Sequence, residues 1–379
     1  PNNGSKLRIY NLLRGLAQHH QITLLAFADQ PDVDPEVPEL RSLCSSIQVI
    51  PWKPYNPHSR QARLGFLSVT PRSVVDTYSP ELEGRIREEI SSGDYDLVIA
   101  SQWTMASYGA CFQDLPALFE EAEVGVLYQR FVSATSLWHR CRFGLTWAKQ
   151  RIYLRRLLRD FQACTVVSEP ERALLSSTVP GYQAIEVIPN CISLADYRDV
   201  GGSRKKNTLI FTGPFRYFAN HDAMTWFLEE VYPRIQARVA GVRLIITGDH
   251  ADMPLPAADN LTLTGFVDDV RPLINSASIS LAPIRVGGGT RLKILEAMAL
   301  HTPVVSTLKG AEGLDVQHGE NLLIADTPEE FADAVLRLLG DPVLGQTLAE
   351  KGHQLVRERY DWPAVMPQFL SLVERVART

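Results

Sequence analysis

Short runs of apolar residues alternate along this chain with longer segments in which apolar and polar residues recur at helical spacing. Runs rich in Val, Ile and Leu predict strands at 22–28, 47–52, 97–101, 117–120, 165–168 and 185–189, and again at 208–213, 242–248, 261–266, 279–284, 303–307 and 322–325. Most of these runs are continuously apolar, which is typical of parallel strands covered by helices on both faces. The pattern therefore predicts an α/β protein with two doubly wound domains.

A break in this alternation separates the two halves. Residues 199–207 combine glycines with clustered charges and carry no periodic pattern, which indicates a linker. We expect an N-terminal domain over 1–198, the linker, a C-terminal domain over 208–359 and a closing helix over 360–379.

The first residues form a glycine loop that opens a helix over 9–19. A doubly wound domain presents such a loop from the carboxyl end of a strand. We therefore expect the natural chain to carry about ten further residues ahead of Pro1, enough for a strand and a short loop.

Composition narrows the class of protein. With 379 residues, 45% hydrophobic and 21% charged, the chain is an ordinary globular protein of more than one domain. Its net charge of −5 argues against a dedicated nucleic-acid partner, and its five scattered cysteines form neither a zinc motif nor a secreted disulfide framework. No apolar run predicts a membrane span, so we expect a cytoplasmic protein, with peripheral contact to the inner face of the cell membrane left open.

The segment 282–299 is the strongest candidate for chemistry. Gly287, Gly288 and Gly289 follow a predicted strand and lead into a helix whose first turn we place near Thr290. Glycines allow a ligand to approach the backbone closely, and the start of a helix attracts anions. Positive side chains stand at the same end, namely Arg285, Arg291 and Lys293. The loop predicts a phosphate or diphosphate site, and the alternative is a tight turn with solvent-exposed bases.

Glu296 lies within the helix that follows, among apolar residues. A half-buried carboxylate needs hydrogen-bond donors, and vicinal ribose hydroxyls supply them. An ion pair with Arg291 or Lys293 is the alternative, and the residues alone leave both open.

Together with the Leu-Glu-Ala-Met-Ala and His-Thr-Pro-Val-Val segments, this loop resembles the donor site of the family 4 glycosyltransferases, which are retaining enzymes of the GT-B fold. The opening Gly-Ser-Lys-Leu-Arg loop, residues 187–190, Gly213, residues 265–267 and the closing Tyr-Asp-Trp extend the resemblance over nearly the whole chain. It implies two Rossmann-like domains that face a central cleft, with the C-terminal helix crossing back to the N-terminal domain. It also implies a nucleotide-sugar on the C-terminal domain and an acceptor mainly on the N-terminal one.

The resemblance assigns roles residue by residue. Arg291 and Lys293 would meet the diphosphate and Glu296 would hold the ribose, and these three are the candidate catalytic residues. Phe266 and Val267 stand where the family holds the nucleobase. The candidate donor contacts are Gly4, Gly213, Arg216, Phe266, Val267, Arg285, Gly287, Gly288, Gly289 and Thr290.

The chain departs from the family's pattern at three places. Gly288 replaces the first glutamate of the family's motif, and the loop from Gly213 to Arg216 lacks the closely following lysine. The third departure is an acidic run after the fourth predicted strand, where relatives often carry His or Asn; its members are Glu120, Glu121 and Glu123. These carboxylates are candidates to bind the acceptor or accept its proton, or else they form a solvated loop ahead of a capped helix.

Retaining transfer in this family proceeds without a committed enzyme nucleophile, so the protein supplies positioning and neutralises charge on the leaving diphosphate. Cationic side chains and helix starts do this without a metal. The Asp-x-Asp triplets at 32–34 and 94–96 are interpreted as turns, and no metal site is expected.

Residues 137–159 carry arginines, a lysine and aromatic residues but no acid. Such a segment leaves open a contact with an anionic membrane surface, which would bring a lipid-linked acceptor to the enzyme. The alternative is a helix packed by its apolar face with its bases in water.

We therefore predict a retaining hexosyltransferase without a cofactor. Its donor is a nucleotide-diphosphate-sugar, a UDP-sugar as first choice and a GDP-sugar as second. Its acceptor is a glycan or lipid-linked glycan of bacterial envelope or exopolysaccharide synthesis. The alternatives are a GT-B nucleotide-sugar epimerase, which needs acid and base carboxylates, and a non-catalytic relative that binds nucleotide or glycan.

Overall fold

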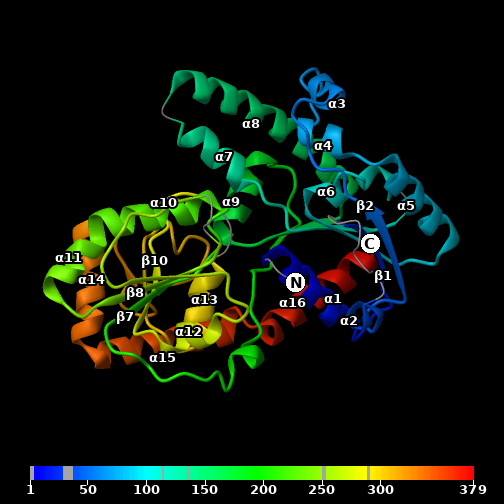
Figure 1. Ribbon diagram of the computed structural model, residues 1–379. Helices are drawn as coiled ribbons and strands as arrows, with labels where there is room; N and C mark the ends of the chain where they lie inside the picture. Colours follow the sequence, from blue (N-terminus) through cyan, green and yellow to red (C-terminus); the bar gives the residue numbers. More distant parts are fainter. Residues whose placement is uncertain (1–3, 29–36, 113–114, 135, 250–252, 288–290) are drawn as a thin grey trace. The chain divides into compact units, whose positions relative to one another are not determined.

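The computed structural model describes residues 4–28, 37–112, 115–134, 136–249, 253–287 and 291–379 (Figure 1). The chain divides into two compact units, one formed by residues 1–189 with 366–379 and the other by residues 190–365. In the described residues, the strands of every sheet pair in parallel and helices connect them. The predicted α/β class is confirmed, and each predicted strand region overlaps a strand.

The first unit holds two parallel sheets. In one, β1 (Thr23–Ala28) pairs with β2 (Ser46–Pro51). The other runs in the order β3 (Val98–Ser101), β4 (Ala117–Glu120), β5 (Ala163–Val166) and β6 (Ile185–Val187). Strands β4 and β5 are buried along their whole length and form the centre of this unit's core.

Helices of very different length accompany these sheets. They are α1 (Gly4–Leu16), α2 (Pro38–Arg41), α3 (Arg60–Leu64), α4 (Arg72–Thr77), α5 (Pro80–Ser92), α6 (Gln102–Ala106), α7 (Gly125–Val132), α8 (Leu137–Leu157) and α9 (Glu169–Thr178). Local sequence explains several starts: the side chains of Ser79 and Ser168 cap α5 and α9, and a proline stands in the first turn of each.

The second unit is built on one sheet that reverses its strand order. The order is β12 (Leu323–Ile324), β11 (Val304–Ser306), β10 (Ile279–Ala282), β7 (Thr208–Phe211), β8 (Arg243–Thr247) and β9 (Leu261–Gly265). The chain runs outward from β7 through β8 and β9 and returns with β10 on the other side of β7. Ligands of open α/β sheets bind at the carboxyl ends of the strands beside such a reversal.

Both faces of this sheet are covered. Leu209 and Phe211 of β7 pack into a core with α10 (Phe218–Trp226), α11 (Tyr232–Arg238) and α14 (Pro328–Gly340). Ile210, between them, points to the opposite core with α12 (Arg271–Ser276), α13 (Leu292–Ala299) and α15 (Pro342–Arg359). This alternation along one strand explains its continuously apolar sequence.

The units divide at a different place from the expected linker. The division falls between Pro189 and Asn190, and residues 199–207 lie against the second unit. Asn275 Nδ2 donates to the Val200 carbonyl at 2.9 Å, and the Lys205 amide donates to the Ser276 carbonyl at 2.7 Å. The glycines and charges of residues 199–207 correctly indicated a loop. They carried no information on the hydrogen bonds that fix this loop to the rest of the second unit.

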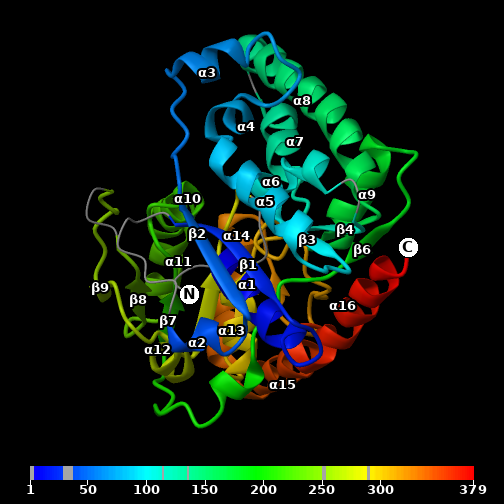
Figure 2. The ribbon, with the colours of Figure 1, turned by 90° about the vertical axis from the view of Figure 1, so that its right-hand side faces the viewer.

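The closing helix α16 (Trp362–Ala377) is shared between the units, because residues up to Val365 belong to the second and those from Met366 to the first. Figure 2 shows α15 and α16 following one another at the end of the chain. No helix among the described residues has the length and apolarity to cross a membrane. All five cysteines are free thiols; Cys141 on α8 is exposed, whereas Cys44, Cys164 and Cys191 are buried.

Candidate functional site

Two glycine loops meet where the second unit's sheet reverses. Gly213 follows β7 with a φ of +144°, and a Cβ there would lie 2.7 Å from Asn220 Nδ2 and 3.2 Å from Lys293 Nζ. Gly287 follows β10 with a φ of +90°, and its Cβ would lie 2.3 Å from the Tyr217 hydroxyl oxygen. Side chains at these positions would displace the polar groups, so the glycines let the loops and these groups converge.

Lys293 projects from the start of α13 into this convergence. Its Nζ donates to Asn220 Oδ1 at 2.9 Å and lies 3.9 Å from the centroid of the Phe211 ring. Burial and the neighbouring Arg291 lower the pKa of Lys293 to about 7. An amine with this pKa is only partly charged near neutral pH and becomes fully charged when an anion binds beside it.

Arg291, just ahead of α13, and Glu296, within it, are the other charged residues near Lys293. The Arg291 side chain is buried, and its Nη2 donates to the Gly287 carbonyl at 2.9 Å. Glu296 Oε1 accepts a hydrogen bond from the Tyr197 hydroxyl at 3.2 Å, and burial raises the pKa of Glu296. Tyr197 was not predicted, because it lies in a short turn (Leu194–Tyr197) just ahead of the expected linker, and no local motif marks it.

The remaining predicted donor contacts of this unit differ in their surroundings. Phe266 directly follows β9 and is 78% exposed, with the less exposed Val267 beside it. The Arg216 side chain is 87% exposed and pairs with Asp249 at 3.4 Å. Gly288, Gly289 and Thr290 lie outside the described residues, and the described helix begins at Leu292.

Arg285 has partners that the sequence did not predict. Its Nη2 pairs with Asp222 at 2.9 Å, and its guanidinium lies 5.3 Å from the centroid of the Trp226 ring. Both partners belong to α10. The charge of Arg285 is therefore matched by a carboxylate on that helix and does not simply add to the positive charge of the glycine loop.

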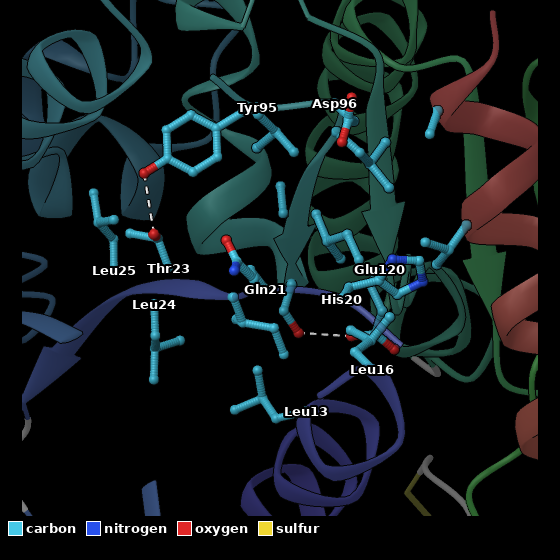
Figure 3. A pocket seen from close by; sticks show the side chains of 18 of the residues that line it. Leu13, Leu16, His20, Gln21, Thr23, Leu24, Leu25, Tyr95, Asp96 and Glu120 are labelled. Carbon is cyan, nitrogen blue, oxygen red and sulfur yellow. Dashed lines mark hydrogen bonds between the residues drawn. The ribbon is translucent and has the colours of Figure 1, made fainter. Parts of the chain in front are cut away.

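Glu120 of the first unit has buried partners that the sequence did not predict. Gly4 opens α1 as expected, and the buried Arg8 of that helix donates from Nε to Glu120 Oε1 at 2.6 Å. The Ser101 hydroxyl donates to Glu120 Oε2 at 2.6 Å (Figure 3). Both carboxylate oxygens of Glu120 are thus engaged inside the unit, where the residue forms a buried ion pair, and its acceptor role stays a prediction.

The other two carboxylates of the acidic run remain candidates. Glu121 directly follows β4 with a φ of +62°, and Gln102 directly follows β3 with a φ of +63°. Gln102 Nε2 donates to Glu121 Oε2 at 3.0 Å. Burial and nearby carboxylates raise the pKa of Glu121, and burial with the neighbouring Glu171 raises the pKa of Glu123 to about 7. Left-handed backbone at residues other than glycine costs free energy and concentrates at functional sites.

The basic segment forms α8, and its apolar residues are not confined to one face. Trp147 and Leu154 are buried, whereas Leu137, Trp138 and Leu145 are exposed beside the bases. Lys149 Nζ donates to the Phe66 carbonyl at 2.6 Å and so ties α8 to the loop after α3. In that loop Leu67 is 92% exposed, and Figures 1 and 2 show α3 beside α8.

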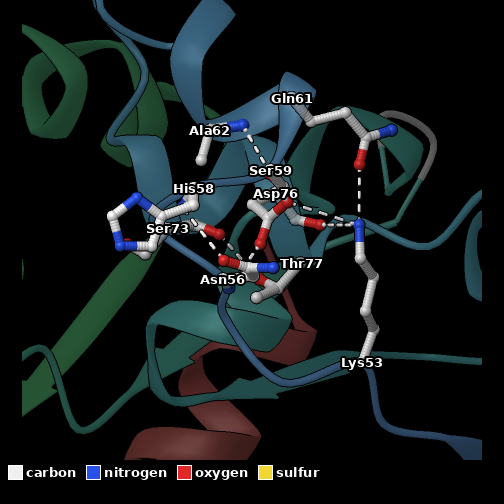
Figure 4. A network of polar contacts seen from close by, with 9 residues as sticks. All are labelled: Lys53, Asn56, His58, Ser59, Gln61, Ala62, Ser73, Asp76 and Thr77. Atoms are coloured by element: carbon white, nitrogen blue, oxygen red, sulfur yellow. Dashed lines mark hydrogen bonds and ion pairs between the residues drawn. The ribbon is translucent and has the colours of Figure 1, made fainter.

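A buried carboxylate anchors this α3–α4 segment (Figure 4). Asp76 has no exposed surface and accepts hydrogen bonds from the Asn56 amide at 2.7 Å, the Ser59 hydroxyl and Lys53 Nζ at 3.3 Å. The hydrogen bond from Ser59 is the largest cause that lowers the pKa of Asp76. The network holds in place a loop whose Phe66 and Leu67 side chains are exposed to solvent.

Comparison with known proteins identifies the family of this chain. The family profile described as "Glycosyltransferase Family 4" matches residues 2–196, which is more than half of the chain, and that described as "Glycosyl transferases group 1" matches residues 206–341. The chain belongs to glycosyltransferase family 4. The fold is accordingly GT-B, with two Rossmann-like units, as the sequence predicted.

Two relatives illustrate the family's chemistry. This family 4 glycosyltransferase is 27% identical to phosphatidyl-myo-inositol mannosyltransferase of Mycobacterium leprae over 98% of this chain and 92% of that protein. It is 29% identical to the lipopolysaccharide core biosynthesis glycosyltransferase LpsE of Rhizobium meliloti over 36% of this chain and 43% of that protein.

Solved structures support the fold over the whole chain. Sucrose-phosphate synthase from Thermosynechococcus elongatus superposes with a TM-score of 0.72 at 17% identity, covering 99% of this chain and 94% of that one. HepE from Anabaena, in complex with UDP and glucose, superposes with a TM-score of 0.65 at 15% identity, covering 99% and 96%.

Proposed function

We propose that this glycosyltransferase transfers a hexose with retention from a UDP-sugar to a glycan or lipid-linked glycan in bacterial envelope or exopolysaccharide synthesis. The mannosyltransferase and the lipopolysaccharide enzyme among its relatives support the acceptor class. The UDP held by HepE supports the donor, with a GDP-sugar as second choice.

One observation carries the proposal: Lys293, Asn220 and the two glycine loops converge at the sheet reversal of the second unit. In the proposed complex the diphosphate lies beside Lys293 and the start of α13, where the helix dipole favours negative charge. Arg291 tethers the Gly287 loop beside it through the hydrogen bond to the Gly287 carbonyl. Glu296, oriented by Tyr197, receives the ribose hydroxyls, and Phe266 contacts the base.

The chemical step follows from this arrangement of charge. The bond between the anomeric carbon and the diphosphate oxygen breaks, and a bond from the same face of the sugar to the acceptor oxygen forms. The proton of the acceptor hydroxyl passes to the leaving diphosphate. Lys293 and the helix start stabilise the negative charge that grows on this leaving group, so the proposed step requires no metal.

The first unit carries the acceptor in this proposal. Gln102 and Glu121 present an amide and a carboxylate at neighbouring strand ends, which suits the hydroxyls of a sugar acceptor. The exposed apolar and basic side chains of α8 and the α3–α4 segment suit the anionic inner face of the cell membrane, where a lipid-linked acceptor resides.

The test is donor consumption by the purified chain. We would measure the release of nucleotide from UDP-glucose, UDP-galactose and GDP-mannose, with and without bacterial lipid extract as acceptor, and identify the product's anomeric configuration by NMR. Lys293→Ala and Glu296→Ala should abolish release, whereas Lys351→Ala, at an exposed lysine of α15, should not.

Three outcomes would contradict the proposal. An isomerised donor without transfer would favour an epimerase. Nucleotide binding without consumption in any acceptor mixture would favour a non-catalytic relative. An inverted anomeric product would overturn retention.

A further inference from the structure

Asn220, in the first turn of α10, is held at both ends of its side-chain amide. The residue is 4% exposed. Its Nδ2 donates to the Pro214 carbonyl at 2.7 Å, and its Oδ1 accepts from Lys293 Nζ at 2.9 Å. A carbonyl oxygen only accepts hydrogen bonds, so the amino end of the amide must face Pro214 and the oxygen must face Lys293. One buried side chain therefore joins the loop after β7, α10 and α13 in a single orientation.

Two glycines let the backbone close around this amide. A Cβ at Gly213 would lie 2.7 Å from Asn220 Nδ2, and a Cβ at Gly248 would lie 2.1 Å from the Gly213 carbonyl oxygen. Both glycines have a positive φ, of +144° and +115°. The amide is thus fixed by its packing as well as by its hydrogen bonds, and its oxygen is in place before any ligand binds.

The surroundings of Lys293 differ from element to element. Burial lowers the pKa of Lys293 most, Arg291 at the start of the same helix lowers it further, and Glu296 within that helix raises it. Strand β7 contributes the Phe211 ring, whose centroid lies 3.9 Å from Nζ, and α10 contributes the amide of Asn220. The hydrogen bond that Nζ donates therefore goes to a neutral group instead of a carboxylate.

The neutrality of this partner has a chemical consequence. A buried ammonium ion is ordinarily matched by a carboxylate, because a buried charge without a partner is costly. A carboxylate at this point would cancel the charge of Lys293 and repel a diphosphate. An amide oxygen fixes the direction of Nζ but adds no charge, so a bound anion supplies the negative charge that the ammonium ion lacks.

We propose that Asn220 is a positioning residue for Lys293: its neutral amide aims Nζ and leaves the positive charge available for the diphosphate of the donor. This inference rests on the proposed function, because that function supplies the diphosphate. It requires an amide at this position specifically. Asn220→Asp keeps the size of the side chain and the oxygen that accepts from Lys293, but it adds the charge that the proposal excludes.

The experiment compares the unmodified protein with Asn220→Asp, Asn220→Ala and Asn275→Asp. Asn275 of α12 also donates its Nδ2 to a loop carbonyl, that of Val200 at 2.9 Å, so its substitution is the same chemical change elsewhere in the second unit. Competitive acetylation with trace acetic anhydride, read by mass spectrometry across pH, gives the pKa of Lys293 without any ligand. Titration calorimetry with UDP at pH 6 gives the affinity, and urea unfolding checks that each variant folds.

The two substitutions of Asn220 should displace the pKa of Lys293 in opposite directions. Asn220→Asp should raise it by about 1 or more, because the new carboxylate favours the ammonium ion, and should weaken UDP binding about tenfold or more. Asn220→Ala should lower the pKa, because the charged form loses an acceptor, and should also weaken binding. Asn275→Asp should change neither. A merely structural role would lower stability without these opposite displacements.

The same pKa of Lys293 in the unmodified protein and both Asn220 variants would overturn the proposal, as would displacement in one direction by both. Unchanged UDP affinity in Asn220→Asp would also overturn it. If Asn220→Asp does not fold, Asn220→Ala decides the point, since it adds no charge and must lower the pKa. Absence of UDP binding by the unmodified protein would contradict the proposed function instead, and acetylation alone would then decide whether Asn220 holds Lys293.

Discussion

At the scale of single residues, Lys293 carries the most chemical information. An amine is normally charged at neutral pH, but here burial beside Phe211 and the nearby Arg291 favours the neutral form. A diphosphate reverses this balance by favouring the ammonium ion. Under the proposed function, binding of the donor and uptake of a proton are therefore linked at this residue.

This linkage predicts a pH-dependent affinity. The pKa of Lys293 is about 7 in the free protein and rises in the complex, so binding of UDP is strongest below pH 7 and weakens as the pH rises above it. The expected loss approaches tenfold per pH unit until the pKa of the complex is reached. Titration calorimetry between pH 6 and 9 measures it. Lys293→Arg should flatten this pH profile because arginine stays charged. The control Lys351→Arg should leave the profile unchanged. A flat profile in the unmodified protein would contradict the linkage.

The site residues that sequence could predict are those whose function depends on local pattern. The glycine loop, Lys293 and Glu296 lie within one short segment, and the structure brings Lys293 together with Gly213 and Asn220. The partners of Glu120 and Arg285 were not predictable. Arg8 is 112 residues from Glu120, and Asp222 is 63 residues from Arg285, so only the folded chain brings these charges together.

At the scale of elements, the hydrophobic pattern was sufficient to locate the strands. A buried parallel strand must be apolar on both faces, so each appears as a short continuous run. The strand ends were less certain: β5 begins at Ala163, before the predicted 165, because no turn residue marks its start. The pattern could not separate the two roles of α8, whose apolar residues serve both the core and the exposed surface.

The exposed surface of α8 and the α3–α4 segment yields a prediction about membranes. Leu67→Glu with Trp138→Glu should lower affinity for vesicles containing phosphatidylglycerol about tenfold or more, since each change removes apolar contact and adds negative charge. Both side chains are largely exposed, so folding should persist. Vesicle co-sedimentation at low salt measures the effect. Val343→Glu, on the exposed start of α15, is the matched control; equal binding by all variants would contradict the membrane surface.

A stacked histidine pair predicts how acid affects the second unit. The rings of His301, which follows α13, and His353 of α15 have centroids 4.1 Å apart, and burial lowers the pKa of both. The unfolded chain therefore takes up protons at a higher pH than the folded one, so stability is full above the ordinary histidine pKa and declines as pH falls through it. Urea unfolding at pH 8 and pH 5.5 should show this decline. His353→Gln should reduce the difference, and an unchanged difference would exclude the pair as its source.

At the scale of the whole molecule, the last helix links the two units through one continuous backbone. Its first turn belongs to the second unit, and Phe369, Leu372, Val373 and Val376 are buried in the part that belongs to the first. Pro367 lies inside the helix at this transition. A defect in the later part of α16 should therefore affect the two units unequally.

Phe369→Ala tests this inequality. Removing a fully buried phenylalanine should destabilise the first unit by about 3–5 kcal/mol, while binding of UDP to the second unit stays unchanged below the unfolding transition. Denaturant unfolding and calorimetry measure the two effects. Ser371→Ala, at an exposed position of the same helix, should change neither, and a parallel loss of UDP affinity in Phe369→Ala would show that the units are not separable in this way.

The placement of the five thiols has a practical consequence. Burial raises the pKa of the Cys44, Cys111 and Cys164 thiols, and Cys191 is buried as well. Only a thiolate reacts rapidly with maleimide or iodoacetamide reagents. A brief reaction at neutral pH should therefore attach an environment-sensitive dye to Cys141 on the exposed basic helix, so the unmutated chain carries its own fluorescent reporter position for lipid contact.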